Sequence, residues 1–325
     1  MAQFLAQCFG LFGKGAHGTR VILKGIALYQ RPVLIYNPAA GKLRRNPERI
    51  LQRTTEALGS VGLRPELLAT KGPGHATALA RKAVADGADL VLVLGGDGTF
   101  NEAASGMVGS RVPIGFLPGG TANVLAMELG LGSNVARAAE RLGACVPKRI
   151  AVGRVCYPAA EARYFFLMAG VGLDAAIVNS VSPWLKARAG KLAYWAAGFA
   201  RFVQPVEQFE GTVGDEGGVF GFALASCVRN YGGDMEIASG ASLLTDDFEV
   251  VLFRGGNPLR YAAYMLAVGV KQVQKMPGVK TARAADFEIR GNAPIQLDGE
   301  SAGHAPARFE IVKDALTLLM PETYR

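Results

Sequence analysis

Residues 90–102 read LVLVLGGDGTFNE, and this stretch decides the fold. Its first five residues are all apolar, which predicts a strand buried on both faces of a sheet. The glycines after it would let the backbone approach a ligand, and the helix expected next would present its N-terminus there. This unit predicts a phosphate-binding loop in which Thr99 offers a hydroxyl. Asp97 would repel a phosphate unless a cation lies between them, so it indicates Mg²⁺ or a role in proton transfer.

Strands and helices alternate around this unit, from Arg31 to about Cys145. Strands are expected near residues 33–36, 65–70, 89–94 and 113–117, with helices at 47–58 and 75–85. Asn46 and Pro47 suit the N-cap and first position of the first helix. The pattern predicts a parallel, Rossmann-like sheet covered by helices on both faces.

The second half of the chain is rich in short alternating strands separated by glycine turns, which predicts antiparallel sheets with one wet face. One of these strands is expected over 219–229, and helical stretches interrupt the strands at about 182–203 and 258–275. We place the boundary between the domains near Pro147. The predicted parts are a lead over residues 1–30, an α/β domain over 31–147 and a β-sandwich over 148–325, with the alternative that the last strand returns to the first domain.

Composition narrows the class of protein. The 325 residues carry 35 Lys+Arg against 27 Asp+Glu, a net charge of +8, and all of the excess lies in residues 1–150. This asymmetry indicates an anionic partner. The longest charge-free stretch, 112–127, is shorter than the roughly 20 apolar residues of a membrane-spanning helix. The four cysteines lack the close-pair spacing of zinc sites, and reduced thiols in the cytosol are the default. We expect a soluble or peripheral protein.

Small polar residues and glycines follow three other strands as well, at 37–41, 70–76 and 117–123. The carboxyl ends of neighbouring parallel strands share one edge of the sheet, where open α/β sheets bind ligands. Four converging loops of this kind predict a nucleotide site. The Gly-Lys-Ser/Thr loop of P-loop enzymes is absent from the sequence, and none of these four strand ends carries the spaced Gly-x-Gly-x-x-Gly signature.

These motifs resemble the diacylglycerol kinase catalytic domain, a family that includes bacterial soluble lipid kinases and sphingosine kinases. The resemblance rests on GGDGT at 95–99 with Asn-Glu directly after it, Asn-Pro at 37–38 and PGGTAN at 118–123. It continues through AGVGLDA at 169–175, NYGGDM at 230–235 and LDGE at 297–300. It implies an ATP-binding N-terminal domain, a C-terminal β-sandwich that receives the lipid, and an active site between them. The implied cofactors are ATP and Mg²⁺.

The resemblance and the glycine loops together supply the predicted site residues. Those expected to bind ATP are Asn37, Gly41, Thr70, Lys71, Gly72, Pro73, Gly74, His75, Ala76, Gly95, Gly96, Gly98, Thr99, Glu102, Gly120 and Thr121.

Three carboxylates are the predicted catalytic residues, Glu300, Asp97 and Asp298. Glu300 matches the residue proposed as general base in bacterial members, and Asp97 as the base is the alternative left open. Asp298 and Glu300 flank Gly299, so in a strand both would project to one face as a metal-and-base pair.

A structural Mg²⁺ site of bacterial relatives would fall on Leu243, Asp246 and Phe248. Here Asp247 stands where those relatives carry glycine, so retention and loss of that metal are equally open.

The predicted function is an ATP-dependent lipid kinase that phosphorylates a hydroxyl of diacylglycerol or a related lipid, a sphingoid base included. The alternatives are an NAD kinase, which shares the glycine loop, and a non-catalytic nucleotide- or lipid-binding protein. We expect a cytoplasmic, peripherally membrane-associated enzyme whose partners are a bilayer lipid and a transient anionic membrane surface. Basic and aromatic residues in 185–203 indicate an interfacial helix there. A homodimer is left open, and no nucleic-acid-reading module is present.

Overall fold

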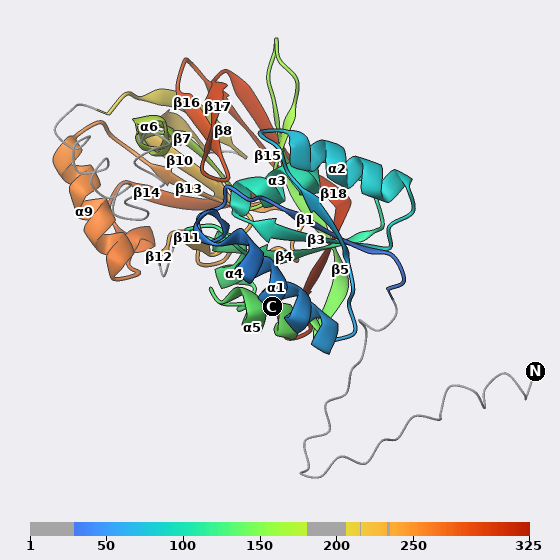
Figure 1. The fold of residues 1–325 in the computed structure, drawn as a ribbon. Coiled ribbons are helices and arrows are strands. Elements are labelled where there is room, and N and C mark those ends of the chain that lie inside the picture. Colours follow the sequence, from blue (N-terminus) through green and yellow to red (C-terminus); the bar gives the residue numbers. More distant parts are fainter. Residues whose placement is uncertain (1–28, 181–205, 215, 233–234) are drawn as a thin grey trace, which may run out of the picture.

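The computed structural model describes residues 29–180, 206–214, 216–232 and 235–325 of the chain (Figure 1). Most of the lead over 1–30 and the predicted interfacial helix therefore lie outside the described residues. Within them, an N-terminal α/β domain with a mostly parallel sheet joins a C-terminal antiparallel β domain, as the sequence predicted.

The N-terminal domain is built on four parallel strands in the spatial order β2-β1-β3-β4. Each strand leads into a loop and then a helix. The elements are β1 (Pro32–Tyr36), η1 (Leu43–Arg45), α1 (Pro47–Ser60), β2 (Glu66–Ala69), α2 (His75–Ala85), β3 (Leu90–Gly95), α3 (Asp97–Ser105), β4 (Pro113–Pro118), α4 (Val124–Glu128) and α5 (Val135–Leu142).

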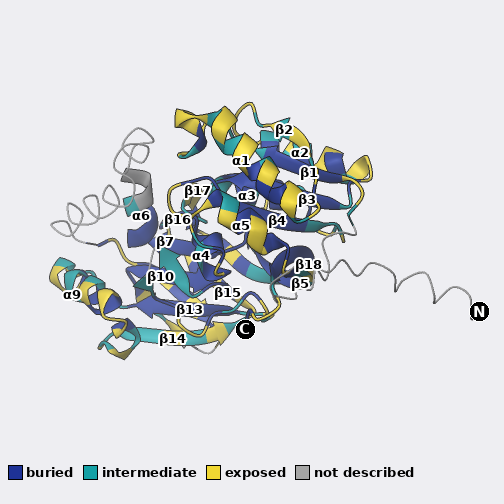
Figure 2. Cartoon of the chain, turned by 60° about the horizontal axis from the view of Figure 1, so that its bottom comes forward, coloured by how far each residue is buried: buried dark blue, intermediate teal, exposed yellow. Residues whose placement is uncertain are grey.

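Local sequence signals explain these elements. Asn46 caps α1 by accepting a hydrogen bond from the Arg49 amide at 3.1 Å, and Pro47 occupies the first helical turn. All six residues of β3 are buried, because α1 and α5 cover one face of the sheet and α2 and α3 the other (Figure 2). The sheet therefore brings the carboxyl ends of four strands to one edge.

The C-terminal part is antiparallel apart from one pairing. Its elements are β5 (Cys145–Cys156), β6 (Arg163–Phe165), β7 (Met168–Gly172), α6 (Leu173–Ser180), β8 (Phe209–Val213), β9 (Glu216–Phe220), β10 (Phe222–Ser226), β11 (Asn230–Gly232), β12 (Met235–Glu236), β13 (Phe248–Phe253), α9 (Pro258–Gly269), η2 (Val273–Lys275), β14 (Val279–Ala284), β15 (Asp286–Arg290), β16 (Pro294–Leu297), β17 (Glu300–His304) and β18 (Ala307–Pro321).

The strand β18 connects the two halves of the molecule. It pairs in parallel with β4 and in antiparallel fashion with β5 and β15, so the first sheet continues as β4-β18-β15-β8-β9. The second sheet has the order β14-β13-β10-β7-β16-β17. Phe165 of the first sheet stacks on Phe248 of the second at 5.4 Å, and Phe287 stacks on Phe309 at 4.5 Å. These aromatic rings form the core between the sheets.

Two predicted boundaries were wrong for local reasons. The expected strand over 219–229 is divided into β9 and β10 at Gly221, where an added Cβ would lie 2.8 Å from the Gly255 carbonyl oxygen. The expected helix over 258–275 ends at Gly269, and a short 3₁₀ turn follows Lys271, which has a positive φ of 56°. Both breaks depend on close tertiary packing or on backbone conformation rather than on hydropathy.

Candidate active site

The glycine loops after β3 and β4 lie directly against each other. The amides of Gly119 and Gly120 donate to the Gly95 carbonyl at 2.7 and 2.9 Å. A Cβ on Gly120 would lie 2.5 Å from the Cα of Gly96, and backbone atoms cannot move aside as a side chain can. The two loops can therefore approach this closely only as glycines.

The loop after β1 packs against the loops after β3 and β4, and we call the three loops together the glycine cradle. Asn37 donates from Nδ2 to the Thr99 hydroxyl at 3.1 Å, and its own side-chain oxygen accepts from the Ala39 amide at 2.9 Å. A Cβ on Gly41 would lie 3.2 Å from the Thr121 Oγ1. The structure thus brings together predicted site residues from the loops after three strands.

The loop after β2 reaches the same edge through Glu102 of α3. The Ala76 amide donates to Glu102 Oε2 at 3.2 Å, and the Thr77 hydroxyl donates to the Glu102 carbonyl at 2.8 Å. Within this loop the Lys71 amide donates to His75 Nδ1 at 3.0 Å. Thr70, Gly72, Pro73 and Gly74 complete the turn that leads into α2. Glu102 and His75 thus fix the shape of the loop.

Lys42 is a residue of this edge that the sequence interpretation missed. Its ammonium donates to the carbonyls of Pro118 at 2.9 Å and of Ser133, and its amide donates to the Gly119 carbonyl at 3.0 Å. Burial lowers the pKa of Lys42. The side chain therefore ties the loop after β1 to the loop after β4, and it adds a cation beneath the glycines.

Asp97 begins α3 and points at the first turn of α4. Its Oδ2 accepts from the Val124 amide at 3.0 Å and its Oδ1 from the Leu125 amide at 3.2 Å. Burial raises the pKa of Asp97 to about 6 against these hydrogen bonds, and the charge of Asp298 adds to the rise. Each carboxylate oxygen can accept a second bond, so the group keeps room for a proton or a cation.

The structure corrects the expectation that Asp298 and Glu300 project from one face of a strand. Asp298 and Gly299 are the two turn residues between β16 and β17, with positive φ angles of 50° and 84°. Positive φ at both central positions is typical of a two-residue hairpin turn, which Asp-Gly favours. Strand geometry therefore does not apply to this pair.

The Asp298 carboxylate has all of its acceptor positions filled. Oδ2 accepts from Asn101 Nδ2 at 2.7 Å and the Phe166 amide at 2.9 Å, and Oδ1 from the amides of Leu167 and Met168 at 2.9 and 3.0 Å. Burial raises the pKa of Asp298 although these bonds oppose the rise. Its contacts make Asp298 the anchor that attaches the β16–β17 hairpin to α3 through Asn101.

Glu300, the first residue after this turn, lies against the glycine loop. A Cβ added to Gly98 would collide with Glu300 Oε1 and lie 3.3 Å from its Cδ. A carboxylate from the C-terminal sheet is thereby held at the N-terminus of α3, 202 residues away in sequence from the glycine that it contacts. Of the three predicted catalytic carboxylates, Glu300 is the exposed one.

A buried polar cluster supports the same hairpin from behind and was not predicted. Gln296 accepts from the Gly299 amide at 2.7 Å and donates to Asp174 Oδ2 at 2.7 Å. The Tyr231 hydroxyl donates to the other oxygen of Asp174. Burial raises the pKa of Asp174, and the two donors oppose the rise. The motifs around 169–175 and 230–235 therefore contribute to the position of Glu300.

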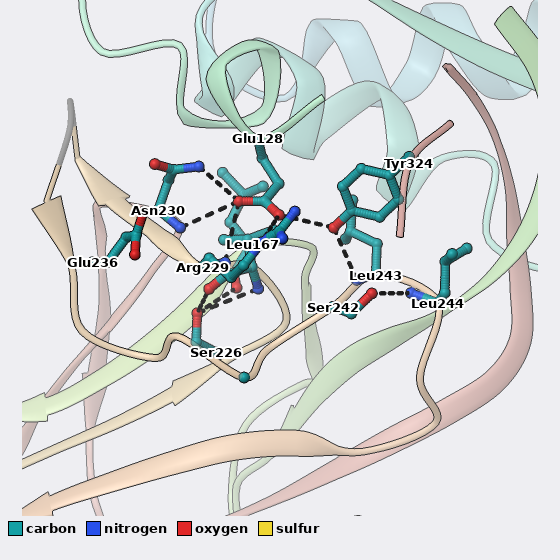
Figure 3. A network of polar contacts seen from close by, with 12 residues as sticks. Glu128, Leu167, Ser226, Arg229, Asn230, Glu236, Ser242, Leu243, Leu244 and Tyr324 are labelled. Atoms are coloured by element: carbon teal, nitrogen blue, oxygen red, sulfur yellow. Dashed lines mark hydrogen bonds and ion pairs between the residues drawn. The ribbon is translucent and has the colours of Figure 1, made fainter. Parts of the chain in front are cut away.

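Glu128 connects the far end of α4 to the C-terminal part (Figure 3). Its buried carboxylate accepts from Asn230 Nδ2 at 2.7 Å, from the Tyr324 hydroxyl at 2.8 Å and from Arg229 Nε at 3.1 Å. The same tyrosine hydroxyl accepts from the Leu243 amide at 3.3 Å. Asp97 at one end of α4 and Glu128 at the other thus fix this short helix between the two halves of the molecule.

An arginine of β14 binds the loop of the predicted structural metal site. Arg283 donates from Nε to Asp247 at 2.7 Å, from Nη1 to the Gly240 carbonyl at 2.8 Å and from Nη2 to the Thr245 hydroxyl at 3.0 Å. Asp246 lies 3.7 Å from the ammonium of Lys313, with both side chains more than half exposed. The described residues contain no cluster of three or more His, Cys, Asp or Glu side chains suited to a metal ion. The site at Leu243, Asp246 and Phe248 stays a prediction.

The sequence of this chain is similar to sequences of known proteins. Residues 31–155 match the diacylglycerol kinase catalytic domain family. The diacylglycerol kinase of Bacillus subtilis (strain 168) is 26% identical over 305 residues, covering 90% of this chain and 97% of that protein. The diacylglycerol kinase of Staphylococcus carnosus (strain TM300) is 25% identical over 302 residues, covering 90% and 96%.

Solved structures share the fold. A crystal structure of a diacylglycerol kinase from Bacillus anthracis (strain Sterne) superimposes with a TM-score of 0.72 at 21% identity, covering 92% of this chain and 99% of that chain. Another structure from that organism gives a TM-score of 0.76, covering 97% and 100%. At 21% identity these two likenesses show a shared fold. The chain is thus similar to diacylglycerol kinases over about 90% of its length, with their catalytic domain matched at residues 31–155, and this similarity supports a kinase that transfers phosphate to an alcohol.

Proposed function

We propose that the protein is an ATP-dependent kinase that phosphorylates a hydroxyl of diacylglycerol or a related lipid, a sphingoid base included. The observation that carries the proposal is the contact of the Glu300 carboxylate with Gly98 of the glycine loop. Phosphoryl transfer needs a phosphate cradle and a carboxylate within reach of the acceptor hydroxyl. The two curated relatives above, which are diacylglycerol kinases, support the choice of acceptor.

The glycine cradle suits a nucleotide triphosphate. The glycines at positions 95, 96, 119 and 120 have no side chains, so the backbone there can approach the phosphates closely. The N-terminus of α3 adds partial positive charge. Asp97, which has its carboxylate at this cradle, would hold a bound Mg²⁺, and Glu300 would act as the base. The ion would neutralise phosphate charge as the γ-phosphoryl group transfers.

In the proposed reaction the acceptor hydroxyl oxygen forms a bond to the γ-phosphorus, and the bond from that phosphorus to the β–γ bridging oxygen breaks. Glu300 takes the proton of the hydroxyl, and ADP leaves with the electron pair of the broken bond. Asn101 and Asp298 hold the hairpin that carries Glu300, so they act as positioning residues. Asp97 as the base is the mechanistic alternative, since its pKa of about 6 is also suited to proton transfer.

Replacing Glu300 by glutamine tests the assignment of the base. We expect Glu300→Gln to lower kcat by about 10²- to 10⁴-fold, because a positioned general base contributes that much, while KM for ATP changes little. Glu322→Gln, at an exposed position near the C-terminus, is the matched control. If Glu300→Gln retains nearly full turnover while Asp97→Asn does not, the base is Asp97.

The proposed substrate resides in a bilayer, so we infer that the enzyme works from the cytoplasm as a peripheral membrane protein. In the described residues, no helix is both long enough and apolar enough to cross a membrane. The predicted homodimer stays a prediction.

A further inference from the structure

We propose that the outer face of α9 is the surface by which the enzyme docks on an anionic lipid bilayer. The inference rests on the proposed function in that the substrate is taken to be a bilayer lipid. Its evidence is independent of the active site. It consists of an exposed apolar stripe on α9, a surrounding segment that carries cations and no acids, and a rigid attachment of the helix to the second sheet.

The inner face of α9 is firmly attached to the sheet. The Tyr261 hydroxyl donates to the carbonyls of Phe253 and Gly255 at 3.2 and 3.0 Å, and the Tyr264 hydroxyl donates to the Pro277 carbonyl at 3.0 Å. The ring of Tyr264 packs edge-on against Phe253 at 5.3 Å. The helix therefore cannot rotate to bury its opposite side on its own domain.

That opposite side presents three aliphatic residues to solvent. Leu259, Leu266 and Val270 are 79%, 76% and 68% exposed. Their spacing of seven and four residues places them on one side of a helix with about 3.6 residues per turn. Elsewhere in the described residues, large hydrophobic side chains are exposed only at Leu67, Val219 and Leu244, which belong to three separate elements or loops. The α9 stripe is thus a cluster, whereas the others are isolated.

The segment that carries this stripe has charges of one sign, although two of its cations pair with carboxylates of other segments. Residues 254–285 contain six Lys or Arg and no Asp or Glu. Lys271 pairs with Glu236 at 2.8 Å, and Arg283 pairs with Asp247. Arg260 and Lys275 are exposed. The Arg260 guanidinium lies near Gly255 and Gly278, at the flank of the inner face, and Lys275 is in the 3₁₀ turn after the helix. An apolar stripe with a cationic rim complements anionic headgroups over acyl chains.

The location of α9 suits docking. Figures 1 and 2 both show the helix at the outer end of the C-terminal sheet, on the side of the molecule away from α1 and α2. A bilayer at this face would leave the helices of the N-terminal domain in water.

A second copy of the chain is a poorer occupant of this face. In a two-fold dimer each residue near the axis approaches its own counterpart. Arg260 and Lys275 would then face the same cations of the other copy, and the segment offers no carboxylate to separate them. A bilayer that contains anionic lipid supplies the missing negative charge.

Flotation with liposomes tests the proposal. The full chain is mixed with vesicles of phosphatidylcholine alone, or with phosphatidylcholine vesicles that contain about 30 mol% phosphatidylglycerol. We expect binding to the anionic vesicles, with a loss of at least tenfold in Leu259→Ser/Leu266→Ser/Val270→Ser. The charge-reversed Arg260→Glu/Lys275→Glu should lose the preference for anionic over neutral vesicles. Leu67→Ser/Leu244→Ser removes two exposed leucines elsewhere and should bind as the wild type does.

Thermal unfolding checks that every variant is folded, which the exposure of the changed side chains favours. Turnover of a water-dispersed short-chain diacylglycerol should be unchanged in the α9 variants, while turnover of a vesicle-embedded diacylglycerol should fall. Wild-type vesicle binding by the folded triple variant would overturn the docking proposal. The proposal would also be overturned if the triple variant changed from dimer to monomer in sedimentation without a change in vesicle binding. Failure of wild-type turnover on both lipids would instead contradict the proposed function and leave the vesicle result to be judged separately.

Discussion

Replacing Gly98 by alanine perturbs the contact on which the proposed mechanism depends. The added Cβ would collide with Glu300 Oε1 and with no backbone atom within contact distance. Gly98 lies in α3 and its φ is not positive, so alanine is compatible with the backbone there. The variant should therefore move the Glu300 carboxylate and leave the fold intact.

The expected effects on stability and on activity differ in size. Alanine is favoured over glycine within a helix by about 1 kcal/mol. Turning the end of an exposed glutamate side chain costs about the same, roughly 0.5–1.5 kcal/mol. The free energy of unfolding should thus change by less than about 1 kcal/mol. A displacement of about 1 Å in a catalytic group costs on the order of 10²-fold in rate, or about 2.7 kcal/mol.

The assay is a double-mutant cycle on kcat with Glu300→Ala, accompanied by urea unfolding of each variant. Gly59→Ala is the matched control, because Gly59 is also helical and an added Cβ there would meet nothing within 4 Å. In the Glu300→Ala background, Gly98→Ala should have no further effect on kcat.

Two results would refute this reasoning. One is wild-type kcat in Gly98→Ala. The other is an equal loss in the presence and absence of the Glu300 side chain, together with a raised KM for ATP, which would mean that the methyl group obstructs the nucleotide itself.

Three further perturbations follow from the contacts described above. Because burial raises the pKa of Asp97 from 3.8 to about 6, kcat/KM should fall tenfold per pH unit below about pH 6 if the ionised form is required. The folded state then binds more protons than the unfolded state between these values. The contribution of Asp97 to the free energy of unfolding is therefore greatest below its unfolded pKa, and about 3 kcal/mol is lost as the pH rises through about 6. If the free energy of unfolding of Asp97→Asn depends on pH as steeply as that of the wild type, this prediction is contradicted. Glu128→Gln should lower the free energy of unfolding by about 3 kcal/mol, because it leaves the buried partners of Glu128 without an anion, and Tyr324→Phe should lower it by about 1 kcal/mol. Urea unfolding measures both values, and equal small effects would show that the network is not stabilising. Because Arg283 of β14 already holds the loop over residues 240–247, EDTA should leave the thermal midpoint unchanged and Arg283→Met should lower it by several degrees. A midpoint lowered by EDTA would assign a structural metal to the loop.

The sequence was sufficient for the features that depend on local pattern. The apolar run at 90–94, the caps at Asn46 and Pro47 and the glycine loops are short-range signals, and the structure has the predicted strand, helix and sheet edge at those places. Convergence of the loops also followed from sequence, because parallel strands in one sheet necessarily end on the same side.

The remaining features depend on pairings between distant residues. The strand geometry expected at Asp298 was wrong because the turn requires positive φ at two positions, which hydropathy does not reveal. Asp174 and Gln296 are 122 residues apart, and their contact exists only because β7 and β16 are neighbours. The exposure of the α9 stripe was likewise hidden, since an apolar helix face normally predicts burial.

The central claim is that this chain transfers phosphate from ATP to a lipid hydroxyl with Glu300 as the base. The most direct measurement is incubation of the full chain with a total lipid extract and γ-labelled ATP, with the labelled products identified by mass spectrometry. The account predicts a labelled phospholipid derived from diacylglycerol or a related lipid, and its loss in Glu300→Gln. Labelled NADP in a parallel reaction with NAD, or no labelled product in either reaction, would contradict it.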